Sequence, residues 1–203
     1  MDQLGLSVQE KEMLKRESLQ AQLHTLKTHV NPHFLFNNLN TLCSIIPENP
    51  RQAVDFVQQL SKVYRYILEV KDEKSISLRD EIKVLEAYSF LMKTRFGNNF
   101  NIEVLIPEKD MDNQIVPYSL QLLVENAIKH NIVSADKPLW IKVHTVNGEL
   151  LVTNNLQKKK QEVESTGIGL NNIRNRYMLL TNKLVAVTET EFNFSVSIPL
   201  IPS

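Results

Sequence analysis

Hydrophobic positions in the first part of the chain recur at heptad-like spacing, which is the pattern of a helix with one apolar stripe. The recurring residues are Leu19, Leu23, Leu26 and Val30. Between Val8 and Ile46 the chain has no Gly and only one Pro, so we predict one long helix. Such a helix would be about 58 Å long, more than a small domain covers with its own core. We therefore expect it to pair with another helix and with a second chain.

A second amphipathic run predicts a helix over Arg51–Val70, after Pro47 and Pro50 end the first one. The expected apolar stripe of this second helix consists of Val54, Val57, Leu60, Tyr64, Ile67 and Leu68. Two such hairpins would form a four-helix dimer. The polar stretch Lys71–Ser77 is the expected domain boundary.

The remainder of the chain alternates between helical and strand-like patterns. A helix is predicted over Leu78–Phe96, with Asp80 and Glu81 complementing the helix dipole in its first turn. Further helices are expected at Pro117–Ile132 and Gly169–Leu180. Strands are expected at Phe100–Ile106, Trp140–Val146, Leu150–Thr153, Val185–Thr190 and Phe192–Ile198, with Asn147-Gly148 as a hairpin turn. This alternation predicts an α/β second half.

Composition narrows the classes of function. The 203 residues include 23 Lys and Arg against 23 Asp and Glu, so a net charge of zero excludes a strongly basic nucleic-acid binder. Hydrophobic residues make up 42% of the chain, which is typical of soluble globular proteins. Cys43 is the single cysteine and cannot form an internal disulfide, which favours a reducing compartment. No apolar run is long enough to span a bilayer, and the N-terminus is too polar for a signal peptide.

The segment Asn31–Leu39, with the sequence NPHFLFNNL, contains the first candidate site. A proline inside a helix costs roughly 3 kcal/mol, and a local bend that presents His33 would account for it. Asn37 follows one turn later on the same face and can orient the imidazole, whose neutral nitrogen can act as a nucleophile. Taken alone, the commoner role of such a histidine is a partly buried side chain on an apolar stripe. His29 and His33 also have the spacing of two metal ligands, but no third ligand is evident nearby.

The second candidate site is the segment Leu120–Asn131, with the sequence LQLLVENAIKHN. A helix here buries its leucines on one side and places Glu125, Asn126 and Lys129 together on the other. Oxygen ligands and an ammonium group within one turn suit a magnesium-phosphate group. An ordinary solvated helix face is the alternative.

The third candidate site is the segment Ser165–Tyr177, with the sequence STGIGLNNIRNRY. Gly167 and Gly169 stand two apart and open a helical run, where free backbone N–H groups can receive phosphate. A tight turn from loop to helix would explain the same glycines.

The three segments, in this order, resemble the LytS/YehU-type sensor histidine kinases. The resemblance extends from about Leu19 onward and includes Leu78-x-x-Glu81 and Arg95-Phe96. It implies the fold class α + α/β, with a helical dimerisation and histidine phosphoacceptor domain at 1–75. An ATP-binding catalytic domain would follow at 76–203, as a two-layer α/β sandwich of the Bergerat type, similar to those of gyrase and MutL.

The resemblance also implies a role for each motif. His33 would be the phosphorylated histidine, with Asn37 orienting its ring. Asn126 would coordinate Mg²⁺. The other residues expected to bind ATP and its phosphates are Glu125, Lys129, His130, Asn131, Asn154, Thr166, Gly167, Ile168, Gly169 and Leu170. The segment Asn155–Thr166, which contains Lys158, Lys159 and Lys160, would form a lid over ATP.

The chain departs from the usual histidine kinase pattern at the adenine position. Those kinases carry an Asp-x-Gly box, whereas here Asn154 replaces the aspartate and no glycine follows. An amide oxygen accepts a hydrogen bond without charge assistance, so we predict weaker adenine binding. Phe34 follows His33 where many kinases have an acidic residue, and Leu122 stands where related ATPases often have a polar one. The leucine disfavours water activation.

The resemblance as a whole implies the core of a two-component sensor histidine kinase that is active as a homodimer with ATP and Mg²⁺. It would phosphorylate His33 and pass the phosphoryl group to an aspartate of a response regulator, expected to be of LytTR type, without touching nucleic acid itself. The chain would be the cytoplasmic portion of a membrane sensor, anchored through a region outside it. The alternative, motivated by Asn154, is a catalytically degenerate nucleotide-binding dimeric scaffold, and an ATPase switch without histidine transfer is a weaker third option.

Overall fold

The structure is a computed structural model that describes residues 32–70, 72–159 and 168–203. The part of the predicted long helix before residue 32 therefore lies outside the described residues. In chain order the elements are α2 (Pro32–Glu48), α3 (Pro50–Glu69), β1 (Ile76–Ser77), α4 (Leu78–Phe96), η1 (Gly97–Asn99), β2 (Phe100–Leu105), η2 (Glu108–Asp110), β3 (Gln114–Ile115), α5 (Ser119–His130), β4 (Leu139–Val146), β5 (Glu149–Asn155), α6 (Ile168–Thr181), β6 (Ala186–Glu189) and β7 (Asn193–Pro199).

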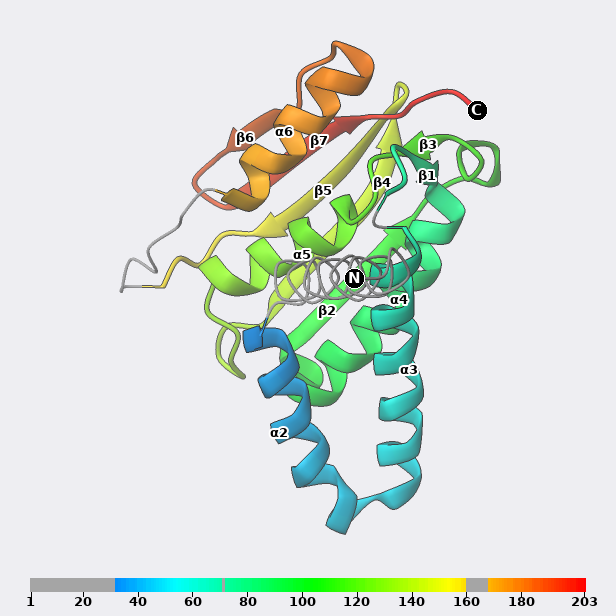
Figure 1. Cartoon of the computed structure of the whole chain (residues 1–203). Helices are drawn as coiled ribbons and strands as arrows, with labels where there is room; N and C mark the ends of the chain where they lie inside the picture. The colour runs from blue at the N-terminus through cyan, green and yellow to red at the C-terminus, as the bar shows by residue number, and fades with distance from the viewer. Residues whose placement is uncertain (1–31, 71, 160–167) are drawn as a thin grey trace, which may run out of the picture.

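Helices α2 and α3 form the predicted hairpin, which extends away from the sheet (Figure 1). The predicted end of the first helix at Pro47 is wrong, because α2 continues through this proline to Glu48. Pro47 stands one residue before the end of α2, so the backbone bond that its missing N–H removes is lost only in the last turn. Asn49 then caps α3, accepting a hydrogen bond from the Gln52 amide at 3.1 Å, and Pro50 takes the first helical position.

The apolar stripe predicted for α3 is correct in part. Leu60 and Ile67 are buried, but Val54, Val57 and Leu68 are exposed. The helix carries two apolar faces, and the one that packs in this structure consists of Ala53, Phe56, Leu60, Val63, Tyr66 and Ile67. Phe36, Leu39 and Ile46 of α2 are exposed as well. We refer to these three residues together with Val54, Val57 and Leu68 of α3 as the second apolar face of the hairpin.

Five strands form a mixed sheet in the order β2-β4-β5-β7-β6. Only β2 and β4 run parallel, and the other neighbours are antiparallel. The predicted hairpin turn between β4 and β5 is confirmed, with Asn147 at φ 52° and Gly148 at φ 78°. Positive φ at both positions is the geometry that matches the twist of paired strands. A small second sheet pairs β1 with β3.

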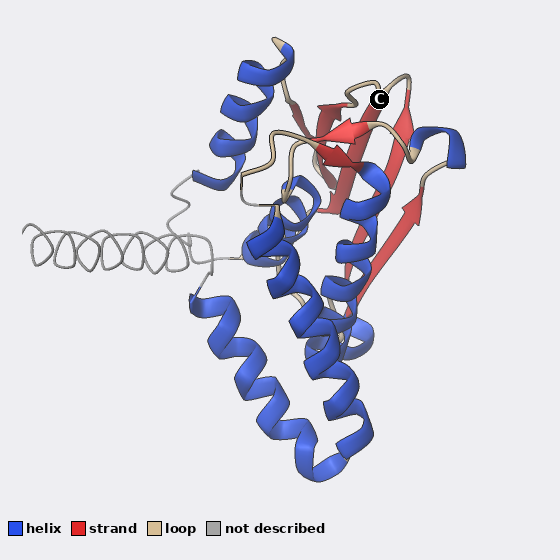
Figure 2. Cartoon of the chain, turned by 45° about the vertical axis from the view of Figure 1, so that its right-hand side comes forward, coloured by secondary structure: helices blue, strands red, loops and turns tan. Residues whose placement is uncertain are grey.

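Helices α4, α5 and α6 lie on one face of the five-stranded sheet (Figures 1 and 2). Strand β4 shows the alternation that this layering requires, with Leu139, Ile141 and Val143 buried and Trp140 and Lys142 exposed. The predicted fold class is confirmed, as helices followed by a mixed α/β sheet covered on one side. One hydrophobic cluster runs from the α2–α3 hairpin through α4 to the sheet. In the described part of the chain, no helix is both long and apolar enough to cross a bilayer.

Candidate functional site

His33 lies exposed in the first turn of α2. The next residue, Phe34, is buried and stacks on Tyr88 of α4 with ring centroids 5.4 Å apart. Asn37 Nδ2 lies 3.1 Å from both ring nitrogens of His33, so the predicted pairing of these two side chains is present. The interpretation of His33 as a partly buried core histidine does not fit this position. Phe34 anchors the turn, and the imidazole faces outward.

The second and third motifs meet between α5 and α6. Helix α5 buries Leu120, Leu123, Val124 and Ala127, and it leaves Glu125, Asn126 and Lys129 half-buried. Gly169, in the first turn of α6, faces the Asn126 side chain. A Cβ atom at Gly169 would lie 3.7 Å from Asn126 Oδ1 and 3.8 Å from Nδ2. The absence of a side chain at this position keeps the space above the Asn126 amide open.

The other residues of the glycine motif are placed in part. Thr166 and Gly167 lie outside the described residues, and Ile168 begins α6. Leu170 is half-buried and packs against the core. The starts of α2 and α6 and the carboxyl end of α5 lie along one side of the molecule in both cartoon views (Figures 1 and 2). All three motifs therefore face the same side.

The carboxyl end of α5 is tied to the segment that follows β5. Asn131 is 2% exposed, and its amide donates to the Ala127 carbonyl at 2.9 Å and accepts from the Gln157 N–H at 2.7 Å. Lys159 Nζ donates to the carbonyls of Ile128 and Lys129 at 3.1 and 2.9 Å. Both polar ends of the Asn131 side chain are thus engaged within the protein.

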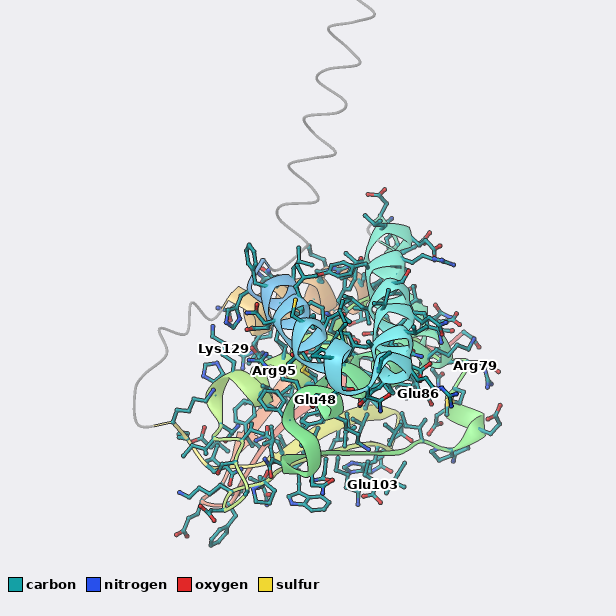
Figure 3. The ribbon with its side chains drawn as sticks, turned by 90° about the horizontal axis from the view of Figure 1, so that it is seen from below. Glu48, Arg79, Glu86, Arg95, Glu103 and Lys129 are labelled. Atoms are coloured by element: carbon teal, nitrogen blue, oxygen red, sulfur yellow. The ribbon has the colours of Figure 1, made fainter. Side chains whose placement is uncertain are left out.

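Several cations gather at this end of α5. Burial lowers the pKa of His130, and the positive charges of Lys129 and Lys159 lower it further. Burial also lowers the pKa of Lys159, with Arg95 as the second cause. Arg95 and Lys129 are both labelled in the view from below (Figure 3). Lys158 is instead paired with Glu189 of β6. A concentration of positive charge beside Asn126 favours an anionic ligand.

Asn154 occupies the core-facing side of β5 and is 5% exposed. Its Nδ2 donates to the Asn155 carbonyl at 2.7 Å. This bond leaves the side-chain oxygen as the group that can accept from a ligand.

The described residues contain no cluster of three or more His, Cys, Asp or Glu side chains that could hold a metal ion alone. Mg²⁺ does not require such a cluster, because it is often held by one or two protein oxygens together with substrate phosphates. Asn126 offers an amide oxygen beside the space that Gly169 leaves open. The predicted coordination of Mg²⁺ by Asn126 is compatible with this oxygen donor.

Glu81 has buried partners that the sequence pattern does not predict. Its position in the first turn of α4 suggested a charge that complements the helix dipole, but the side chain is only 2% exposed and is turned into the protein. Asp80 is the acidic residue that lies exposed near the helix N-terminus, where it complements the dipole. Its backbone N–H donates to Ser77 Oγ at 3.2 Å. The pattern of a single helix gives no signal for the true partners of Glu81, because they lie on α3 and at the start of α5.

Comparisons with known proteins agree with the motifs. Residues 21–100 match the family model described as histidine kinase. Sensor histidine kinase BtsS of Escherichia coli strain K12 is 39% identical over 111 residues, which are 55% of this chain and 20% of that protein. Sensor histidine kinase/phosphatase LytS of Staphylococcus aureus strain N315 is 33% identical over 128 residues, covering 63% of this chain and 21% of that protein. The chain thus spans about a fifth of the length of these relatives.

Among solved structures, the catalytic domain of histidine kinase ThkA matches with a TM-score of 0.44 and 17% identity, over 63% of this chain and 97% of that one. Acinetobacter baumannii histidine kinase AdeS matches with a TM-score of 0.39 and 13% identity, over 86% and 98% of the two chains. The sequence matches carry the likeness: this chain is similar to the sensor histidine kinases BtsS and LytS, and this similarity confirms the resemblance given by its motifs.

Proposed function

We propose that the chain is the kinase core of a two-component sensor, which phosphorylates His33 with ATP and passes the phosphoryl group to an aspartate of a response regulator. The observation that carries this proposal is the position of Gly169 facing the Asn126 amide, which brings two sequence-distant motifs together on the side where α2 begins. Residues 1–75 would form the dimerisation and phosphoacceptor domain, and residues 76–203 the ATP-binding domain.

ATP would bind over α5 and the first turn of α6. Mg²⁺ would be held by Asn126 together with phosphate oxygens, and it would neutralise charge on the transferred group. Lys129, Lys159 and Arg95 supply a positive potential for the phosphates. Glu125, His130 and the residues from Thr166 to Leu170 complete the expected binding set. The Asn154 oxygen would accept a hydrogen bond from the adenine amino group, more weakly than a carboxylate does.

A ring nitrogen of His33 would attack the γ-phosphorus. The bond from phosphorus to the β,γ-bridging oxygen breaks and ADP leaves, while a phosphorus–nitrogen bond forms. Asn37, 3.1 Å from the ring nitrogens, would hold the imidazole in the attacking orientation. Because this transfer involves little covalent chemistry by the protein, most of the catalysis is positioning and electrostatic stabilisation.

Dimerisation is proposed through the second apolar face of the hairpin. Phe36 is 64% exposed and Val54 is 58% exposed. Packing this face against a second hairpin would give a four-helix bundle. The response regulator is proposed to be of LytTR type, with any DNA contact made by that partner. The membrane connection is proposed to run through a sensor region outside this chain, which places the chain on the cytoplasmic side.

The test is to incubate the purified chain with Mg²⁺ and γ-labelled ATP and to compare it with His33→Gln. We expect an acid-labile label on the parent chain and none on the variant. Transfer of this label to an aspartate of an added regulator tests the second step.

The second candidate function is a nucleotide-binding dimeric scaffold without kinase activity. Asn154 favours it, because this residue replaces the aspartate that is usual in histidine kinases. Measurable ATP binding with no label on His33 would support the scaffold and contradict the kinase.

A further inference from the structure

A buried carboxylate joins the hairpin to the start of the helix that carries Asn126. Glu81 Oε1 accepts a hydrogen bond from the Leu120 N–H at 3.0 Å, and Oε2 accepts one from the Tyr118 N–H at 3.3 Å. The Tyr66 hydroxyl of α3 donates to the same Oε2 atom. A side chain of α4 therefore binds both the hairpin and the free N–H groups at the first turn of α5. We call Tyr66, Glu81 and Tyr118 the Glu81 junction.

The two tyrosines of the junction also contact each other. Their rings meet edge to face, with centroids 5.4 Å apart and an interplanar angle of 69°. The Tyr118 hydroxyl reaches back to the hairpin and donates to the Ile67 carbonyl at 2.6 Å. The Tyr66 hydroxyl of α3 thus bonds to the carboxyl group that holds the start of α5, and the Tyr118 hydroxyl bonds back to α3.

Tyr118 adopts a backbone conformation that is unusual for a bulky residue. Its φ is 68°, in the left-handed region, at the N-cap of α5. Such a conformation is strained for a residue with a side chain and persists only where the surroundings hold it. Here Glu81 holds the Tyr118 N–H, and Ile67 holds its hydroxyl. The first turn of α5 is therefore fixed by contacts with the hairpin side of the molecule.

Helix α6 is tied to the same place. Arg176 Nη1 donates to the Pro117 carbonyl at 3.2 Å, and Nη2 donates to the Glu73 carbonyl at 3.4 Å. Tyr177 Oη accepts from the Val116 N–H at 3.2 Å. Helix α6, which carries Gly169, is thus bonded to the segment before α5, and the Glu81 junction bonds the end of that segment to the hairpin.

From this geometry we infer that Tyr66, Glu81 and Tyr118 are positioning residues, whose hydrogen bonds hold the hairpin against α5 so that His33 stays beside the nucleotide. None of the three is placed in the nucleotide site. The inference rests on the proposed kinase function. It makes two distinct statements. The Glu81 junction affects the rate of phosphoryl transfer to His33, and it does not affect the affinity of the chain for ATP.

The chain supplies a matched pair of variants on α3. Tyr66→Phe removes the hydroxyl that bonds to Glu81. Tyr64→Phe makes the same chemical change two residues away, at a buried hydroxyl without a hydrogen-bond partner among the described residues. We expect Tyr66→Phe to slow labelling of His33 about tenfold while the ATP dissociation constant stays within about twofold of the parent value. Tyr64→Phe should transfer at the parent rate, and Tyr118→Phe should repeat the effect of Tyr66→Phe.

A distance measurement tests the junction without relying on activity. Cys43 is exposed on α2 and accepts a spin label, and Asp136→Cys provides a second exposed site in the loop before β4. The labelled chain is diluted with unlabelled chain, so that only distances within one chain are recorded. We expect a narrow distribution for the otherwise unchanged chain and for Tyr64→Phe, and a broadened one for Tyr66→Phe.

The inference is overturned if Tyr66→Phe matches Tyr64→Phe in both measurements, or if it weakens ATP binding as much as it slows transfer. In the second case Tyr66 only supports the fold of the nucleotide site. A parent chain that binds ATP without labelling His33 contradicts the proposed function instead. The distance distributions would then still decide whether the junction holds the hairpin in place.

Discussion

Gly169 faces the amide of Asn126 from the first turn of α6, and its φ is not in the left-handed region. Gly169→Ala would place a methyl group in ordinary van der Waals contact with that amide, so the fold should accept it. Because alanine is the better helix former, the free energy of unfolding should stay equal or rise by up to about 1 kcal/mol. The same methyl group fills the space proposed for a phosphate oxygen or Mg²⁺. We expect the ATP dissociation constant to rise about tenfold.

Calorimetric titration with ATP and urea unfolding of the same samples check this prediction. Asn175→Ala is the control, since Asn175 is exposed on the same helix and should leave ATP binding unchanged. Unaltered affinity in Gly169→Ala would show that the nucleotide does not approach Asn126 from this side.

Glu81 should make stability depend on pH. Burial raises the pKa of its carboxyl from 4.5 to about 7, against the opposing effects of hydrogen bonds from Tyr66, Leu120 and Tyr118 and of the Arg176 charge. Tyr177 of α6 also interacts with its charge. The folded chain therefore holds this proton at pH values where the unfolded chain has lost it. The stabilisation is complete below about pH 4.5 and is lost as the pH rises through about 7.

Urea unfolding at pH values from 5 to 8.5 should show this loss in the parent chain relative to Glu81→Gln. The variant cannot titrate at this position, so the difference between the two free energies isolates Glu81 from the histidines. A difference that stays constant over the range would contradict the raised pKa.

At the scale of whole elements, the exposed face of α3 should control association. Val54→Glu places a charge in the second apolar face of the hairpin, and a charge is unfavourable in a packed helix interface. Gln58→Glu adds the same charge at an exposed polar position of α3. We expect Val54→Glu to shift the chain from dimer to monomer in sedimentation, with its helical circular dichroism retained. Gln58→Glu should remain dimeric, and equal behaviour of the two variants would exclude this face as the interface.

Local patterns predicted the elements well, and long-range contacts explain where they did not. The predicted helix Leu78–Phe96 has the bounds of α4, because its periodicity and its flanking caps, Ser77 and Gly97, are local to this segment. Periodicity could not separate the two apolar faces of α3, since the choice between them depends on α4. Glu81 and Asn131 bond to groups that are 39 and 26 residues away in sequence. The contact between Asn126 and Gly169 likewise joins distant motifs, and only their order in the sequence pointed to it.

At the scale of the molecule, the shared core predicts that hairpin and sheet unfold together. Val63 of α3 is fully buried, and it belongs to the hydrophobic cluster that continues through α4 to the strands. Val63→Ala should lower the free energy of unfolding by about 2 kcal/mol. Trp140, the only tryptophan of the chain, lies on β4 and reports on the sheet, whereas far-ultraviolet circular dichroism is dominated by the helices. If the described residues unfold as one unit, Val63→Ala lowers the thermal midpoint of Trp140 fluorescence and that of circular dichroism by the same amount. Val54→Ala, an exposed change on the same helix, should move neither. A midpoint of Trp140 fluorescence that stays at the parent value while the helical signal falls would show that residues 76–203 unfold independently of the hairpin.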